Sequence, residues 1–291
     1  MMDTFESAPP PDGTNPPPET PPPPAAPVQP PGLNLLKYPE DLRVRWGWLD
    51  IFVFVLVSIA AYFISAIVLI IAFMAKGTNV QQLQHSPRTL ALFFILNTVM
   101  ASLVQLGFLY LRTRVLSGEP FWRGLGWWSF DSLKLDPRRV VAYCVLTGIV
   151  LSALVNEMSN YVGHKGQLPI EIYFQDRRSI FLLMILAITL APLVEEMIFR
   201  GYIYPVVARS LGIPTGVILT GILFGLLHAP QLSGAWAQIG LLVVVGIVFT
   251  YIRAASRTVL ASYITHLSYN GYIFISTMIQ THGLRNLPFT H

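Results

Sequence analysis

The sequence predicts an all-α, polytopic membrane protein, a bundle of about seven to eight transmembrane helices around a polar intramembrane cavity. Of its 291 residues, 53% are hydrophobic and only 12% are charged, a composition typical of membrane proteins. Apolar runs of about 20 residues, long enough to cross a bilayer as helices, recur along the chain. Nearly all strongly polar groups of the C-terminal half lie inside three of these runs, and such groups need partners in the bundle interior.

The N-terminal segment differs from the rest of the chain. Residues 1–33 contain 13 of the 23 prolines and little that could form a core. This composition predicts a disordered tail with some polyproline II structure. An SH3-type ligand is a second interpretation of the same prolines. The transmembrane domain is predicted to occupy residues 34–291.

Seven apolar runs predict seven membrane-spanning helices, and an eighth span stays open. They cover residues 49–75, 89–111, 139–156, 179–207, 213–228, 236–252 and 258–279. Between the second and third runs, the aromatic residues of 121–128 are typical of a membrane interface. The sequence contains no internal repeat and predicts no broken half-helix of the kind found in many transporters.

The basic residues favour a cytoplasmic N-terminus for this integral, multi-pass membrane protein. With that orientation, 12 Lys and Arg residues fall on the cytoplasmic side and 6 on the other, with Arg200 counted on neither. The basic residues form no run, so nucleic acid is not expected as a partner. Membrane lipids are expected as partners.

The run at 179–207 contains two adjacent carboxylates, Glu195 and Glu196, which are the last acidic residues of the chain. A carboxylate at the centre of a membrane-spanning helix costs about 3 kcal/mol on insertion scales. Arg200 follows Glu196 by four residues and can neutralise its charge on the same helix face. Glu195 has no such partner within its own helix, so we expect its partners on other helices.

Two histidines, His228 and His266, fall inside apolar helices, whereas the other four lie in predicted loops or the tail. Each has a companion four residues away on the same helix face, Phe224 before His228 and Asn270 after His266. Ionisable groups inside the membrane usually face the bundle interior and mark a functional site. The sequence therefore predicts one polar site shared by three helices.

These residue types favour hydrolysis by an activated water molecule. A carboxylate and a neutral histidine can hold and deprotonate water, and a histidine beside an amide can donate to a developing oxyanion. No serine or cysteine is placed as a nucleophile. Ser268 lies away from the His266 face, and Cys144 is predicted to be an inert, buried thiol.

A metal centre is the alternative for the same site. One Glu and two His residues are a known zinc-binding set with an open fourth position, although the H-E-x-x-H pattern of zinc proteases is absent. No cofactor is expected, and a divalent metal such as zinc stays an open alternative.

Three motifs occur in order on successive predicted helices. They are Glu195-Glu196-x-x-x-Arg200, Phe224-x-x-x-His228 and His266-x-x-x-Asn270. Together they resemble the CAAX prenyl protease family of intramembrane, glutamate-type endopeptidases, also called the CPBP or ABI family, over about residues 180–280. The resemblance implies a hydrolase that cleaves a peptide bond of a membrane-associated or lipidated protein. A prenylated CAAX protein is one such substrate.

Catalytic roles follow from the resemblance. It implies that Glu195 and His228 activate the water molecule, and that His266 and Asn270 stabilise the oxyanion. The family fold is a bundle of about eight helices around a cavity open to the cytoplasm, with catalysis favoured to be free of metal.

The remaining motif residues are predicted to support the site. Glu196, held charged by Arg200, and the aromatic ring of Phe224 would order it. Glu195 is expected to face His228 across the bundle, with a water molecule between them.

Two other functions are compatible with the same residues. Glu195, His228 and His266 could form the proton relay of a proton-coupled membrane transporter. The same fold could also act as a non-catalytic membrane scaffold or immunity protein. The absence of a repeat and of predicted half-helices counts against the transporter, and the complete set of motif residues counts against the scaffold.

Overall fold

The computed structural model describes residues 38–79, 81–82, 86–130, 136–163, 176–232 and 235–285. Contacts between Cα atoms divide the chain into two units, Met1–Leu33 and Asn34–His291. The predicted proline-rich tail and three of the six histidines, His85, His164 and His291, lie outside the described residues. His282 follows the last helix in a turn.

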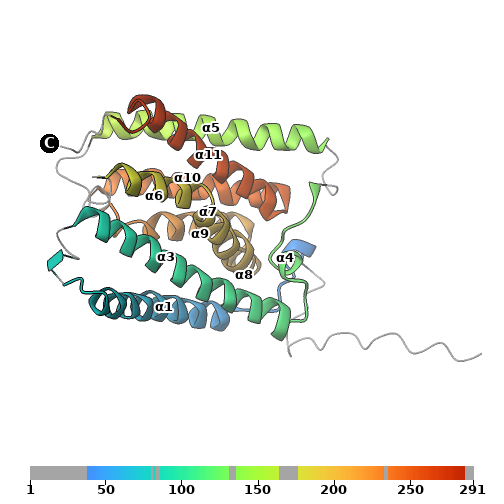
Figure 1. Cartoon of the computed structure of the whole chain (residues 1–291). Coiled ribbons are helices and arrows are strands. Elements are labelled where there is room, and N and C mark those ends of the chain that lie inside the picture. The colour runs from blue at the N-terminus through green and yellow to red at the C-terminus, as the bar shows by residue number, and fades with distance from the viewer. Residues whose placement is uncertain are drawn as a thin grey trace, which may run out of the picture. The chain divides into compact units, whose positions relative to one another are not determined.

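The described part of the second unit is built from helices, without a strand (Figure 1), which confirms the all-α class. In chain order these are η2 (Glu40–Leu42), α1 (Trp48–Ala75), α3 (Pro87–Tyr110), the π-helical η3 (Leu111–Leu116), α4 (Phe121–Gly124), α5 (Pro137–Val162), α6 (Arg177–Ile188), α7 (Leu190–Glu196), the π-helical η6 (Met197–Ile203), α8 (Tyr204–Leu211), α9 (Ile213–Leu227), α10 (Trp236–Ser256) and α11 (Val259–Gln280).

Five segments of the described chain are long and apolar enough to cross a membrane, rather than the predicted seven. They are α1, α3 with η3, α5, α6 to α8, and α10. Helix α9 has only 15 residues and extends about 22 Å, less than a typical hydrocarbon core. Helix α11 has 22 residues, but polar side chains such as Ser262, His266 and Asn270 lower its mean hydropathy.

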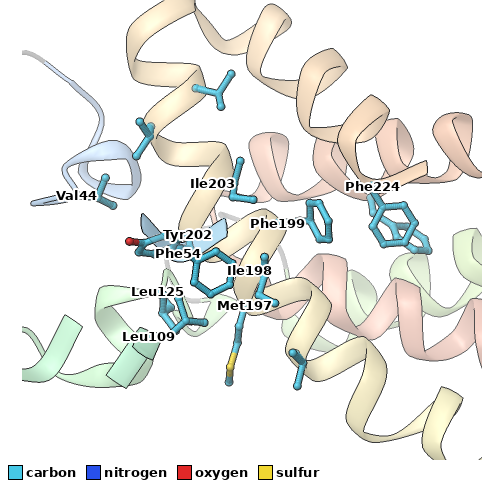
Figure 2. Packing of buried hydrophobic residues seen from close by; sticks show 14 of the residues in the cluster. Val44, Phe54, Leu109, Leu125, Met197, Ile198, Phe199, Tyr202, Ile203 and Phe224 are labelled. Carbon is cyan, nitrogen blue, oxygen red and sulfur yellow. The ribbon is translucent and has the colours of Figure 1, made fainter. Parts of the chain in front are cut away.

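The helices pack mainly in pairs that Figure 1 shows side by side: α1 with α3, α5 with α11, and α9 with α10. Helix α6 contacts α3 and α11, and α7 contacts α11. The segment that carries Glu195 and Glu196 lies at the centre, since every residue from Glu196 to Ala208 is buried. Its apolar side chains, including Met197, Phe199 and Tyr202, form the main hydrophobic core (Figure 2).

The predicted continuous helix over 179–207 is interrupted at Thr189, whose φ of −119° and ψ of −80° are not helical. Pro192 accounts for the break, because it lacks an N–H and its ring clashes with the carbonyl of Ile188, four residues earlier. The span that carries the two carboxylates is thus a pair of shorter helices, which corrects the expectation of no broken helix.

A second irregularity follows the carboxylates. Met197–Ile203 is π-helical, and the N–H of Tyr204 donates to the carbonyl of Phe199, five residues earlier. Pro205 explains the wide turn, since it cannot donate to the carbonyl of Gly201 and would clash with it in a regular α-helix. Such π-turns are often found at functional sites.

Helices α9 and α10 approach each other through glycines. A Cβ atom at Gly221 would lie 2.5 Å from the backbone nitrogen of Ile247, whereas one at Gly240 would have no neighbour within 4 Å. We expect Gly221→Ala to lower the melting temperature in detergent, because backbone atoms cannot move aside without separating the helices.

The matched control is Gly240→Ala, on α10. This change should leave the melting temperature equal or raise it slightly, since alanine favours a helix over glycine by about 1 kcal/mol. Equal melting temperatures for the two variants would contradict the close approach of α9 and α10.

Candidate active site

Glu196 is fully buried and accepts three hydrogen bonds. Arg200 donates through Nη1 to Glu196 Oε1 at 3.0 Å, and Nδ1 of His266 lies 3.0 Å from the same oxygen. Ser262 donates through Oγ to Glu196 Oε2 at 2.6 Å. The ion pair that the spacing of Glu196 and Arg200 predicts is present, with both side chains 0% exposed.

Arg200 connects this carboxylate to α9 and α10. Its Nη2 donates to the carbonyl of Gly246 at 3.0 Å and its Nε to Oγ1 of Thr250 at 3.3 Å. Its guanidinium also lies 4.6 Å from the centre of the Phe224 ring, within the range of a cation–π interaction. Phe224 in turn faces Phe199 edge-on across the core (Figure 2).

His266 lies between the two carboxylates. Because an ionised carboxylate only accepts hydrogen bonds, Nδ1 of His266 is the donor to Glu196. Its other nitrogen, Nε2, lies 3.8 Å from Oε2 of Glu195. The ring packs 4.6 Å from that of Phe249 and 5.8 Å from that of Phe224. These contacts direct Nδ1–H at Glu196 and hold the plane of the imidazole.

Glu195 is in a different environment from its neighbour, because its side chain is 22% exposed and its Oε2 lies 3.8 Å from Nε2 of His266. Among the residues that the structure describes, no direct hydrogen bond joins Glu195 to His228. The structure therefore brings His266, rather than His228, into direct range of Glu195. A carboxylate that is partly exposed and whose oxygens are free to accept further hydrogen bonds is suited to accept a proton.

His228 caps the C-terminal end of α9, one residue beyond the helix. Its Nδ1 lies 2.9 Å from the carbonyl oxygen of Phe224, and the two rings are 5.0 Å apart. Since a carbonyl only accepts, Nδ1–H is the donor, and in the neutral imidazole Nε2 keeps its lone pair. Through Phe224, His228 belongs to the same cluster as Arg200 and His266.

Asn270 lies at the helix break. Its Nδ2 donates to the carbonyl of Ala187 at 2.7 Å, a carbonyl close to the interruption that Pro192 causes. Asn270 also lines a small apolar cavity of about 110 Å³ between α6 and α11. Because an amide nitrogen has two N–H groups, one of them stays available to a further acceptor.

Ser262 and Thr250 are site residues that the three motifs do not include. Ser262 lies four residues before His266 on the same helix face, which is the signal in the sequence that could have suggested it. The contact of Thr250 with Arg200 joins residues 50 apart in the chain and has no such signal.

We expect Ser262→Ala to lower the melting temperature by several degrees, since a hydrogen bond to a charged group contributes about 1.5–3 kcal/mol. The control is Ser268→Ala on the same helix, where Oγ donates only to the carbonyl of Ile264. If thermal unfolding shows the same small change in both variants, the hydrogen bond from Ser262 to Glu196 does not stabilise the site.

The geometry also bears on metal binding. In the described ranges, no group of three or more His, Cys, Asp and Glu side chains is placed to hold a metal ion. The oxygens of Glu196 are engaged by Arg200, His266 and Ser262 instead. Cys144 is buried and forms no disulfide, in agreement with the predicted buried thiol.

Comparison with known families agrees with this arrangement. Residues 177–272 match the model of the type II CAAX prenyl endopeptidase Rce1-like family, whereas no curated protein and no solved structure matches the chain. The matched segment runs from α6 into α11 and contains all three motifs. Over residues 177–272, this integral membrane protein is thus similar to the Rce1-like CAAX prenyl endopeptidases.

Proposed function

We propose that this protein is an intramembrane endopeptidase that hydrolyses a peptide bond of a membrane-associated or lipidated substrate with a water molecule activated by Glu195 and His228. The observation that carries the proposal is the contrast between the two adjacent carboxylates. Glu196 is buried and accepts hydrogen bonds from three side chains. Glu195 is partly exposed, and its Oε2 lies 3.8 Å from Nε2 of His266. One carboxylate orders the site and the other is available for chemistry.

The proposed reaction uses groups in this cluster. Glu195 and Nε2 of His228 hold a water molecule, whose oxygen attacks the carbonyl carbon while its proton passes to Glu195. The amide of Asn270 donates to the oxyanion of the tetrahedral intermediate, and so does Nε2–H of His266 when its ring is protonated on both nitrogens. The C–N bond then breaks, and the proton on Glu195 passes to the leaving nitrogen.

The test is cleavage of membrane-anchored peptides by the purified protein in liposomes, with products identified by mass spectrometry. Peptides with and without a prenyl group distinguish a lipidated substrate from any membrane-anchored one. We expect cleavage that is strongly reduced in His228→Ala and unchanged by strong chelators. Full activity in His228→Ala would contradict the proposed water activation, and loss of activity with a chelator would favour the metal alternative.

A proton-coupled transporter is the second candidate, because one observation favours it. The span that carries Glu195 is broken at Thr189, and discontinuous helices frequently form the ion and substrate sites of transporters. Proton flux in liposomes that requires Glu195, together with no cleavage of any anchored peptide, would favour transport. Neither flux nor cleavage would favour a scaffold role.

A further inference from the structure

Residues 38–47 precede α1 and form a segment that we call the strap. Three arginines from different parts of the bundle bind its backbone and one of its carboxylates. The bonds are Arg112 Nη2 to Arg45 O at 2.7 Å, Arg209 Nη1 to Val44 O at 2.6 Å, Arg209 Nη2 to Trp46 O at 2.8 Å, and Arg253 Nη1 to Asp41 Oδ2 at 2.9 Å. The strap thus ties together η3, α8 and α10 at the end of the bundle where α1 begins.

One of these contacts is an almost fully buried ion pair. The side chain of Arg253 is 0% exposed and that of Asp41 is 8% exposed. Breaking such a pair leaves a buried charge without a partner, which is strongly destabilising. The strap is therefore an integral part of the fold rather than a loose leader to α1.

Through Trp46, the strap contacts η6, the segment that follows the two carboxylates. The indole Nε1 donates to the carbonyl oxygen of Tyr202 at 2.9 Å. The two rings stack with centres 5.1 Å apart and planes 17° from parallel. Both side chains are buried, and Tyr202 belongs to the π-helical η6. Figure 2 shows Tyr202 in the core beside Phe54.

The π-helical form of η6 determines which way the carboxylates face. A π-turn holds one more residue than an α-turn. Its conversion to a regular α-helix would rotate Glu195 and Glu196 by about 100° relative to α8, the angle of one residue. Contacts from outside the helix oppose this change. Trp46 binds Tyr202, and the carbonyl of Leu125 packs so close to Gly201 that a Cβ there would lie 2.8 Å away.

We propose that Trp46 is a positioning residue of the peptidase: by binding Tyr202 it keeps η6 in its π-helical register and so keeps Glu195 directed at His266. The inference rests on the proposed function of Glu195. It gives a role to residues ahead of 177–272, the segment that matches the family, and nothing in the three motifs suggests it.

The test compares Trp46→Ala, Trp46→Phe and Trp48→Ala in the full-length protein. Trp48 is the matched control, because its Nε1 also donates, to Oγ of Ser210, but the side chain is 51% exposed. We expect Trp46→Ala to lower kcat by roughly 10–100-fold, as misplacement of a catalytic group by about 1 Å does, with little change in KM. Trp46→Phe keeps the stacking and should restore part of kcat, and Trp48→Ala should match the wild type.

Hydrogen exchange of the backbone amides gives a second readout that does not depend on activity. We expect faster exchange in residues 197–207 of Trp46→Ala, with the other helices unchanged. Unchanged kcat and exchange in Trp46→Ala would overturn the inference, and so would faster exchange throughout the bundle, which indicates only general destabilisation.

The two proposals can fail separately. If Glu195→Gln is inactive but Trp46→Ala behaves as the wild type, the proposed function stands and the role of Trp46 falls. If the wild type cleaves no peptide, the proposed function falls. The exchange of residues 197–207 then decides whether Trp46 holds η6.

Discussion

Glu195→Gln is expected to lower kcat for peptide cleavage by roughly 10²–10⁴-fold, the range for loss of a general acid or base, with little change in melting temperature. An amide has the shape of the carboxylate but cannot take a proton from water. The fold should tolerate the change because Glu195 is partly exposed and its Oε2 lies 3.8 Å from Nε2 of His266, too far for a direct hydrogen bond. Single-turnover cleavage and thermal unfolding in the same detergent would measure both effects.

The matched control is Glu157→Gln, which makes the same chemical change at an exposed position of α5. It should keep wild-type activity, so that a loss in Glu195→Gln cannot come from altered net charge alone. Cleavage at the wild-type rate by Glu195→Gln would show that another group activates the water molecule.

Glu196→Gln is expected to have the opposite profile, with a large loss of stability. The change removes the negative charge that is hydrogen-bonded to the guanidinium of Arg200, whose side chain is 0% exposed. Breaking a buried ion pair by removing one partner destabilises proteins by about 3–5 kcal/mol. For a protein of this size we expect the melting temperature to fall by roughly 10 °C. Thermal unfolding and the yield of monodisperse protein would measure it.

The double variant Glu196→Gln with Arg200→Gln separates charge from shape. Because it leaves no unpaired buried charge, it should regain part of the stability that Glu196→Gln loses. A single variant as stable as the wild type, or a double variant with the summed losses of both changes, would contradict the role of the ion pair.

The features of the site that the sequence could predict depend on helix geometry and on the membrane environment. The pairing of Glu196 with Arg200 follows from the helical spacing of four residues. The convergence of three motifs follows from the cost of exposing ionisable groups to lipid. Both arguments need only a helix and its environment, so they do not depend on how the helices are packed.

The features that could not be predicted depend on packing between distant segments. Ser262 bonds Glu196 across 66 residues and Trp46 bonds Tyr202 across 156, and no periodicity encodes such contacts. Pro192 and Pro205 are visible in the sequence, but a proline can end, kink or widen a helix. Only the packed structure shows a break at one and a π-turn before the other.

The short length of α9 has a consequence for how water reaches a site inside a membrane. Its 15 residues leave it about 8 Å shorter than a typical hydrocarbon core. Such hydrophobic mismatch is relieved when the bilayer thins beside the helix or when residues at the end of the helix extend to the membrane–water interface. His228 caps that end. The proposed hydrolysis needs a supply of water, and a local thinning of the membrane would deliver it to this imidazole without a pore through the whole bilayer.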